Sequence, residues 1–466
     1  MTLQNPKSID LSDTAFEIRN PFDNTLLDTF SETPRAKIFT AVERAQKAAQ
    51  AFRFSTPHER RTLLGRIVEL MQRDAEVLAG TVSREMGKTI TEARNEIRRA
   101  QNTLRLSGDA ATFLDGEVLH CGIIEGGVDR QAVVTYVPTG VVAAITPFNY
   151  PINLLCHKLG PAIAAGNAVV AKPSPKAPIA AQMLIDLCQE AGAPAGLIQM
   201  VHGGADAAIA LAQAPIDLLS FTGGPGAGLA LKRASGLVRT LMELGGNDPL
   251  FVMPDADLDA AAATAVAHRY EIAGQSCAAV KKLYVHEEIE AEFTALLMEK
   301  VGRVTVGDPL DPATKMGTVI DRAAATEVEA RIKAACDAGA VRLAGGRRQH
   351  TQFDPVVMKD VDPVSKLMAE ETFGPVIAMR SFTDLGLAID EVNAAGFGLQ
   401  AGIYTNDHRA IREASRRLQV GGVMINEGPD FRAEHVPFGG IRKSGLGREG
   451  VRIALREMSE TKVVID

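Results

Sequence analysis

The chain has 466 residues, of which 46% are hydrophobic and 23% are charged, a balance typical of globular proteins and not of disordered ones. This length is more than one ordinary hydrophobic core accommodates, so about two or three domains are predicted. The net charge of −7, without any basic stripe, argues against a nucleic-acid partner.

The N-terminus contains three acidic residues, Asp10, Asp13 and Glu17, and no apolar core, so it is not typical of a signal peptide. No run of about 18 apolar residues predicts a membrane span. Five scattered cysteines do not suggest a disulfide framework, and no Cys-x-x-Cys or His-Glu-x-x-His pattern suggests a metal site. We therefore expect a soluble cytoplasmic protein without a bound metal or a membrane partner.

In chain order, residues 35–112 are predicted to be helical, because apolar residues recur there at helical spacing. From about residue 131, short β-rich runs alternate with helical segments, which predicts crossover units and a mostly parallel sheet. A second block of the same texture begins after residue 248 and is a plausible separate α/β domain. The predicted strands are 133–137, 141–146, 168–172, 197–201, 217–221 and 240–244 in the first block, and 282–287, 375–382, 401–405 and 422–426 in the second.

A glycine-rich turn at 223–228 follows one of these strands and leads into a helix. It departs from the G-x-G-x-x-G pattern, because the last position is Leu229. Such a turn lets a backbone approach a pyrophosphate, and the free N–H groups of the following helix favour an anion. Taken alone, the segment fits an ordinary structural turn about as well as a phosphate site.

Six segments together resemble the aldehyde dehydrogenase superfamily in content, order and spacing: ITPFNYPINL, AKPS, FTGG, MELGGNDP, GQSC and EETFGP. The resemblance extends from about residue 20 to the C-terminus. Among the members of this superfamily, the chain most resembles those that oxidise small polar or anionic aldehydes, such as phosphonoacetaldehyde, phosphonoformaldehyde or lactaldehyde.

The resemblance implies an α/β fold with a Rossmann-like cofactor domain at 1–118 and 133–245 and an α/β catalytic domain at 246–440. It also implies a small β-flap at 119–132 and 448–466. This flap would join copies of the chain into a homodimer or a homotetramer.

By the same resemblance, Cys277 is the nucleophile that forms a thioester, Asn149 is the amide of the oxyanion hole, and Glu243 is the base that activates the hydrolytic water. Each residue also has an ordinary structural interpretation. Cys277 could be a small buried hydrophobe, Asn149 a turn residue before Pro151, and Glu243 a solvated or helix-capping side chain. Glu243 favours hydrolysis over transfer of the acyl group to coenzyme A. A non-catalytic binding protein of this family is the other alternative.

The resemblance assigns the cofactor NAD or NADP to a larger set of residues: Thr146, Pro147, Phe148, Lys172, Ser174, Gly223, Gly224, Gly228, Leu244, Glu371 and Phe373. Two positions depart from the usual pattern. Pro175 stands where many NAD-preferring relatives have a glutamate for the ribose hydroxyls, and Gly224 stands where a serine is usual. Without that carboxylate a 2′-phosphate is not repelled, so both cofactors are admissible.

For the substrate, we hypothesise that Arg432 and His157 bind an anionic tail, because a guanidinium matches carboxylate or phosphonate oxygens. Ser276 is assigned to the same tunnel. Relatives that oxidise phosphonoacetaldehyde have an arginine at this position, so the serine counts against a phosphonate in particular. The alternative for Arg432 is a structural ion pair with Glu434 or Asp430.

Overall fold

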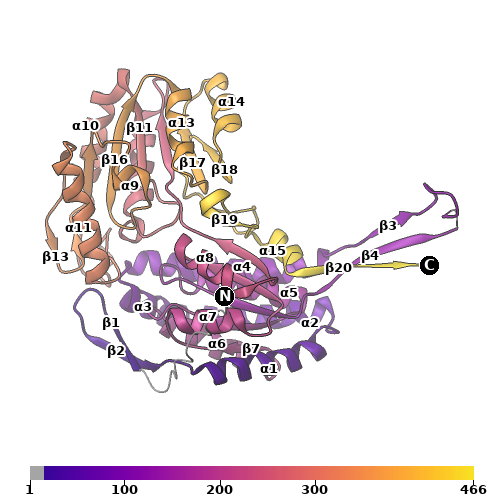
Figure 1. Cartoon of the computed structure of the whole chain (residues 1–466). Helices are drawn as coiled ribbons and strands as arrows, with labels where there is room; N and C mark the ends of the chain where they lie inside the picture. Colours follow the sequence, from indigo (N-terminus) through magenta and orange to yellow (C-terminus); the bar gives the residue numbers. More distant parts are fainter. Residues whose placement is uncertain (1–14, 128) are drawn as a thin grey trace, which may run out of the picture.

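The computed structural model describes residues 15–127 and 129–466, so most of the N-terminal stretch that is not typical of a signal peptide lies outside the described residues. Figure 1 shows two α/β bodies and a narrow β-sheet that projects away from them. Within the described residues, no helix has both the length and the apolar character needed to cross a membrane. The α/β class predicted from the sequence is confirmed.

Four helices precede the first parallel sheet, as predicted for residues 35–112. Two of them begin with capping boxes, in which Thr56 and Thr89 exchange hydrogen bonds with Glu59 and Glu92. An antiparallel hairpin, which the sequence did not reveal, comes before these helices. The hairpin strands are β1 (Ala15–Arg19) and β2 (Leu26–Ser31), and the helices are α1 (Arg35–Phe52), α2 (Pro57–Arg73), α3 (Ala75–Met86) and α4 (Ile90–Ala110).

The first body is built on a six-stranded sheet of order β19-β9-β8-β5-β6-β7, parallel except for β19. Its central strands are buried along their whole length, as expected when helices cover both faces. The strands are β5 (Val141–Ile145), β6 (Ala168–Lys172), β7 (Ile198–Met200), β8 (Leu218–Thr222), β9 (Arg239–Glu243) and β19 (Gly445–Leu446). The helices are α5 (Asn153–Ala165), α6 (Ile179–Glu190), α7 (Ala205–Gln213), α8 (Pro225–Ser235) and α15 (Val451–Glu457).

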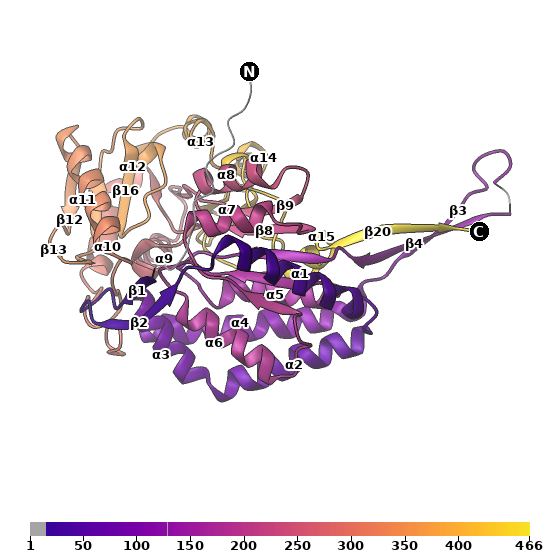
Figure 2. The same ribbon diagram turned by 60° about the horizontal axis from the view of Figure 1, so that its bottom comes forward.

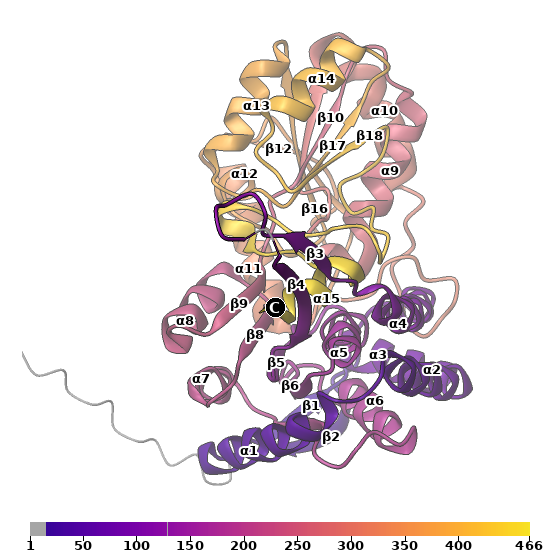
Figure 3. The ribbon, with the colours of Figure 1, turned by 90° about the vertical axis from the view of Figure 1, so that its right-hand side faces the viewer.

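The second body has a seven-stranded sheet of order β12-β15-β16-β11-β10-β17-β18, with only β12 antiparallel, and a hydrophobic core of its own. Figure 3 shows this body above the first one. Its strands are β10 (Pro249–Val252), β11 (Lys282–His286), β12 (Val341–Ala344), β15 (Val356–Lys359), β16 (Val376–Phe382), β17 (Gln400–Tyr404) and β18 (Gly422–Ile425). Its helices are α9 (Leu258–Tyr270), α10 (Glu290–Val301), α11 (Arg322–Asp337), α12 (Lys366–Ala369), α13 (Leu385–Ala394) and α14 (His408–Arg417), and a small hairpin joins β13 (Arg348–Gln349) to β14 (Gln352–Phe353).

The projecting sheet corrects one strand prediction. Residues 133–137 do not open the parallel sheet, because they belong to β4 (Gln131–Pro138), which pairs antiparallel with β3 (Glu117–His120) and β20 (Ser459–Ile465). Figure 2 shows this three-stranded sheet extending from the body. The expected boundaries of the flap at 132 and 448 therefore cut through β4 and include α15, which packs on α5. We propose the same three-part division with the flap limited to the three strands and their connections.

Candidate active site

A cavity of about 230 Å³ lies between the two bodies, where the carboxyl ends of β5, β8 and β9 meet the loop that precedes β11. Ligands of open α/β sheets bind at this end of the strands. Twelve of the predicted site residues line it: Pro147, Phe148, Asn149, Gly223, Gly224, Glu243, Leu244, Ser276, Cys277, Glu371, Phe373 and Arg432.

Cys277 follows a strained turn. Ile272 and Ala273 have positive φ angles of 44° and 52°, and Gly274 follows with 74°. A left-handed conformation costs a non-glycine residue about 1–2 kcal/mol, so the surrounding contacts must hold this turn in place. Gly274 is required, because a Cβ there would collide with the carbonyl oxygen of Gly374.

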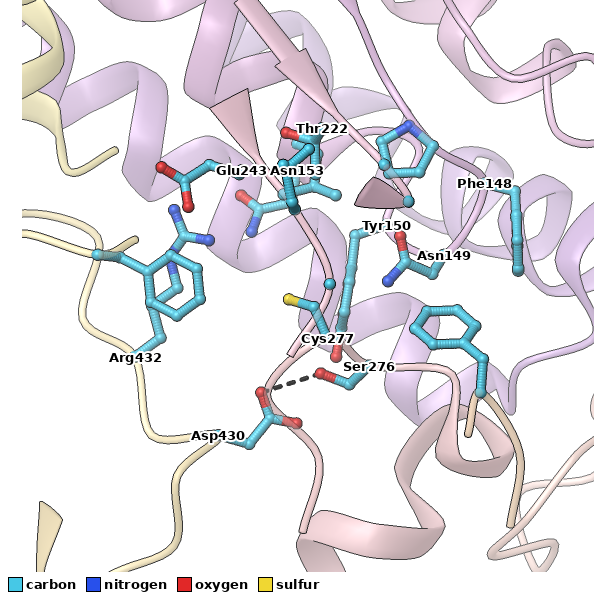
Figure 4. Close-up of a pocket in the computed structure, with 18 of the residues that line it drawn as sticks. Phe148, Asn149, Tyr150, Asn153, Thr222, Glu243, Ser276, Cys277, Asp430 and Arg432 are labelled. Atoms are coloured by element: carbon cyan, nitrogen blue, oxygen red, sulfur yellow. Dashed lines mark hydrogen bonds between the residues drawn. The ribbon is translucent and has the colours of Figure 1, made fainter. Parts of the chain in front are cut away.

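The Cys277 side chain points into the cavity beside Asn149 (Figure 4). Burial raises the pKa of the Cys277 thiol, and the nearby charge of Lys281 opposes this rise. The ammonium group of Lys281 donates hydrogen bonds to the carbonyl oxygens of Ser276 and Cys277. Lys281 therefore both fixes the backbone of Cys277 and favours its thiolate form.

Asn149 joins its own loop to the loop that precedes Cys277. Its Nδ2 donates a hydrogen bond of 2.9 Å to the carbonyl oxygen of Gln275. Asn149 is only 4% exposed, and Figure 4 shows its amide nitrogen on the side facing Cys277. A buried, fixed amide of this kind is a neutral donor for the oxyanion that forms when a thiolate adds to a carbonyl group.

Glu243 ends β9 and is 5% exposed, and its Oε2 has no hydrogen-bond partner. Burial raises its pKa well above the ordinary value, and the charge of Glu449 adds to this rise. Arg432 and Lys158 act in the opposite direction, and both pair with Glu449 at 2.9 and 3.0 Å. Glu243 is therefore a carboxyl whose proton affinity is set by a buried network of charges.

The cofactor expected from the sequence fits this cavity. Helix α8 begins at Pro225 without a side-chain cap, so the N–H groups of its first turn are available to an anion. No atom lies within 4 Å of the place that a Cβ would take at Gly224, which leaves the backbone open there. On the other side of the cavity, Glu371 accepts a hydrogen bond from the N–H of Gly246, and Phe373 meets Phe148 edge to face.

Four predicted cofactor residues do not line this cavity. Thr146 is buried with an unpaired Oγ1, and the Oγ of Ser174 accepts a hydrogen bond from the N–H of Lys176. Lys172 is buried at the end of β6, and burial lowers its pKa to about 8. Gly228 is needed for packing, since a Cβ there would press on Leu244.

The structure brings only one of the two hypothesised anion-binding residues to the cavity. Arg432 lines it, with its guanidinium 4.2 Å from the ring centroid of Phe438 and an Nε that has no hydrogen-bond partner. His157 does not line it, because its Nε2 is 2.7 Å from Oε2 of Glu434 in the interior. His157 is thus corrected to an interior residue, and burial lowers its pKa.

Sequence reasoning missed two charged residues of the cavity wall. Arg99 reaches the cavity from α4 and donates a 2.7 Å hydrogen bond from Nε to Glu434. Asp430 accepts a 3.1 Å hydrogen bond from Oγ of Ser276, as Figure 4 shows. Nothing in the local sequence of α4 distinguishes Arg99 from the other arginines of that helix, so only the fold could identify it.

Among the residues that the structure describes, no group of three or more His, Cys, Asp and Glu side chains could hold a metal ion. The cavity itself presents thiol, amide, carboxylate and guanidinium groups.

Comparisons with known proteins agree with the fold and the cavity on the class of this protein, an aldehyde dehydrogenase. The family model described as "Aldehyde dehydrogenase family" matches residues 9–464. The chain belongs to the aldehyde dehydrogenase family and is an enzyme that uses NAD or NADP.

Particular relatives are similar along almost their full length. A sulfoacetaldehyde dehydrogenase from Neptuniibacter caesariensis is 38% identical over 97% of this chain and 99% of its own. A 3-sulfolactaldehyde dehydrogenase from Priestia aryabhattai is 38% identical over 94% of each chain. The solved NADP-dependent glyceraldehyde-3-phosphate dehydrogenase of Bacillus halodurans, complexed with NADP, has a TM-score of 0.95 and 33% identity over 97% of this chain and 95% of its own.

Proposed function

We propose that this enzyme oxidises a small anionic aldehyde to the carboxylic acid through a thioester on Cys277. The observation that carries the proposal is the convergence of Cys277, Asn149 and Glu243 on one cavity, with Arg99 and Arg432 on its wall. These groups supply a nucleophile, an oxyanion donor, a base and positive charge for the substrate.

In the first half of the reaction, the Cys277 thiolate adds to the aldehyde carbon, and the electron pair of the carbonyl bond moves to oxygen. Nδ2 of Asn149 and the backbone N–H of Cys277 then donate to this oxyanion. Lys281 favours the thiolate, because its charge lowers the pKa of the buried thiol. Bound NAD⁺ or NADP⁺ would supply the hydride acceptor for this oxidation.

In the second half, the Glu243 carboxylate takes a proton from water as the water attacks the thioester carbon. The tetrahedral species collapses, the carbon–sulfur bond breaks, and the acid leaves with Cys277 restored. The unpaired Oε2 of Glu243 is the group available for this proton. The balance is one aldehyde and one water converted to one acid, with a hydride and a proton removed.

Two observations support an anionic substrate. The relatives described above are named for sulfoacetaldehyde and 3-sulfolactaldehyde, and both aldehydes bear a negatively charged sulfonate. Arg432 places its positive charge on the cavity wall, although Glu449 and Glu434 offset much of this charge. Carboxylate- and phosphate-bearing aldehydes share the same recognition chemistry, because a guanidinium donates hydrogen bonds to the oxygens of each of these anions.

The test is NAD(P)H formation at 340 nm by the wild-type protein, Cys277→Ala and Arg432→Ala. Each is assayed with sulfonate- and carboxylate-bearing aldehydes and with a neutral aldehyde of the same length. We expect turnover that requires Cys277 and a loss of kcat/KM in Arg432→Ala of about 10- to 100-fold, confined to the anionic aldehydes. An equal loss for the neutral aldehyde would contradict the role of Arg432, and product formation that requires coenzyme A would favour acyl transfer.

We also propose that the enzyme works in the cytoplasm as a homodimer or homotetramer. All five cysteines are free, which suits a reducing compartment. Strand β20 forms one edge of the projecting sheet and exposes Val463, Val464 and Ile465. An exposed apolar edge strand is normally covered, and a second copy of the chain is the occupant we propose.

A further inference from the structure

Two carboxylates of α4 each hold the backbone of a different catalytic loop. Oε1 of Glu92 accepts a 2.7 Å hydrogen bond from the N–H of Ile272, in the strained turn before Cys277. Oε1 of Glu96 accepts hydrogen bonds of 2.9 and 3.1 Å from the N–H groups of Ile152 and Asn153, just after Asn149. Glu92 and Glu96 are four residues apart, so they lie on the same face of α4.

Each carboxylate is also fixed from a second side. Oε2 of Glu92 accepts the N–H of Thr89 at 2.7 Å, within the capping box of α4. Oε2 of Glu96 accepts a 2.7 Å hydrogen bond from Lys88, and both side chains of this ion pair are fully buried. A buried charge without its partner is strongly unfavourable, so Glu96 cannot easily rotate away from its loop. Glu92 is held by hydrogen bonds to both of its carboxylate oxygens.

The two loops depend on each other for their chemistry. The turn at 272–274 is strained, and such backbone persists only where its surroundings hold it. The hydrogen bond from Asn149 to the carbonyl oxygen of Gln275 already ties one loop to the other. A shift of either loop would therefore move the amide of Asn149 relative to Cys277.

We propose that Glu92 and Glu96 are positioning residues through which α4 sets the separation between the Cys277 loop and the Asn149 loop. This inference rests on the proposed function, in which Cys277 and Asn149 act on the same carbonyl group. Neither carboxylate lines the cavity of the reaction. A misplacement of 1 Å from a distant change can slow a reaction about 100-fold, which is the kind of effect expected here.

The first experiment compares Glu92→Ala with Glu92→Gln. The rate constant of the NAD(P)H burst is measured per active site, and alkylation of Cys277 by iodoacetamide is followed without substrate or cofactor. In Glu92→Ala we expect a burst at least about tenfold slower with little change in KM. Alkylation of Cys277 should become faster, while the buried Cys156 and Cys188 stay protected in the same digest. Glu92→Gln should restore both readouts, because its amide oxygen can accept the N–H of Ile272.

Thr89→Ala is the matched control, because it weakens the cap of α4 and leaves the bond between Glu92 and Ile272 in place. It should lower the melting temperature without changing the burst rate constant per active site.

A second pair of variants isolates Glu96. Lys88→Met/Glu96→Leu removes the buried charge pair together with the acceptor of the two N–H groups, and Lys88→Met/Glu96→Gln restores only the acceptor. We expect a slow burst in the first variant and recovery in the second. Alkylation of Cys277 should be unchanged in both, because Glu96 holds the other loop.

Unchanged burst rate constants in Glu92→Ala and Lys88→Met/Glu96→Leu would overturn the proposal. Equal exposure of Cys156, Cys188 and Cys277 in Glu92→Ala would also overturn it, since that pattern shows general loosening. A wild-type protein without any Cys277-dependent NAD(P)H formation would refute the proposed function instead. In that case, alkylation that changes only at Cys277 in Glu92→Ala supports the role of Glu92, and unchanged alkylation refutes it.

Discussion

At the scale of single residues, the site works by controlling where protons reside. Glu243 is buried beside Glu449, so its pKa lies well above the usual value for a glutamate. Burial opposes the ionisation of Glu449, but the charges of Lys158 and Arg432 overcome this and hold its pKa below its ordinary value. Glu449 therefore stays ionised and makes Glu243 the stronger base of the two.

This arrangement predicts the pH dependence of hydrolysis. Glu243 must be a carboxylate to activate water, so acid release should increase as pH rises through its raised pKa. Glu449→Gln removes a like charge and frees Lys158 and Arg432 to act on Glu243. The acidic limb of the pH profile of acid release should therefore move to lower pH. Single-turnover acid release, followed by rapid quench across pH, checks the shift.

Glu190→Gln is the control for that experiment, because Glu190 pairs with Arg73 at the surface, away from the cavity. Its profile should match the wild type. If the acidic limb of the pH profile stays in place in Glu449→Gln, or moves to higher pH, then Glu449 does not set the proton affinity of Glu243.

At the scale of elements, most of the scaffold could be predicted from sequence. The parallel strands and the four N-terminal helices have clear periodicity. The glycine turn predicted at 223–228 does lead into a helix, but α8 already begins at Pro225. Residues 133–137 were misplaced because a β-rich run does not reveal its pairing partner. His157 was misplaced because helix α5 is buried on all sides, so its sequence does not show which face meets the cavity.

The contacts that hold the loops of the site could not be predicted from the sequence. Ile272 and Ala273 adopt the left-handed backbone conformation, which is usually found at glycine or asparagine, so their residue types did not predict it. Glu92 and Glu96 look like ordinary solvated charges of a helix, and only the fold places them against the two loops. Arg99 and Asp430 likewise reach the cavity wall only because segments distant in the sequence pack together.

The turn after β9 gives a prediction at this scale. A Cβ at Gly245 would collide with Oε2 of Glu371, the residue that we expect to hold the nicotinamide ribose. Gly245→Ala should displace that carboxylate and weaken binding of NAD(P) at least about tenfold, the cost of losing one charged hydrogen bond. Calorimetric titration in a Cys277→Ala background measures this affinity without turnover.

Gly65→Ala provides the control, because Gly65 lies in α2 and no atom lies within 4 Å of its added Cβ. This substitution should leave cofactor affinity unchanged and increase stability by about 0.4–1 kcal/mol. Wild-type affinity in Gly245→Ala would mean that Glu371 does not contribute to binding where we place it.

At the scale of the whole molecule, the cavity draws on both α/β bodies, whereas the projecting sheet contributes no residue to it. The sheet extends away from both cores (Figure 1), and its β20 edge is apolar and exposed. The cavity and the surface that we propose for assembly thus lie in different parts of the chain.

Assembly through β20 can be tested directly. Val463 and Ile465 are two residues apart and lie on one face of the strand, so Val463→Lys/Ile465→Lys should place charge in the proposed interface. We expect a smaller particle by analytical ultracentrifugation, with the fold of each chain kept. Val463→Thr/Ile465→Thr preserves β-propensity without charge and should stay assembled. An unchanged mass in the lysine variant would show that copies associate elsewhere.

The central claim is that Cys277 carries the acyl group until Glu243 activates the water that releases it. Glu243→Gln should therefore form a thioester and lose it slowly, since removing a general base typically costs about 100- to 10,000-fold. Intact-mass spectrometry of Glu243→Gln, mixed with a sulfonate-bearing aldehyde and NADP⁺ or NAD⁺, is the most direct measurement. The account predicts the added mass of one acyl group, mapped by peptide analysis to Cys277. NAD(P)H formation without that adduct, or an adduct on another residue, would contradict it.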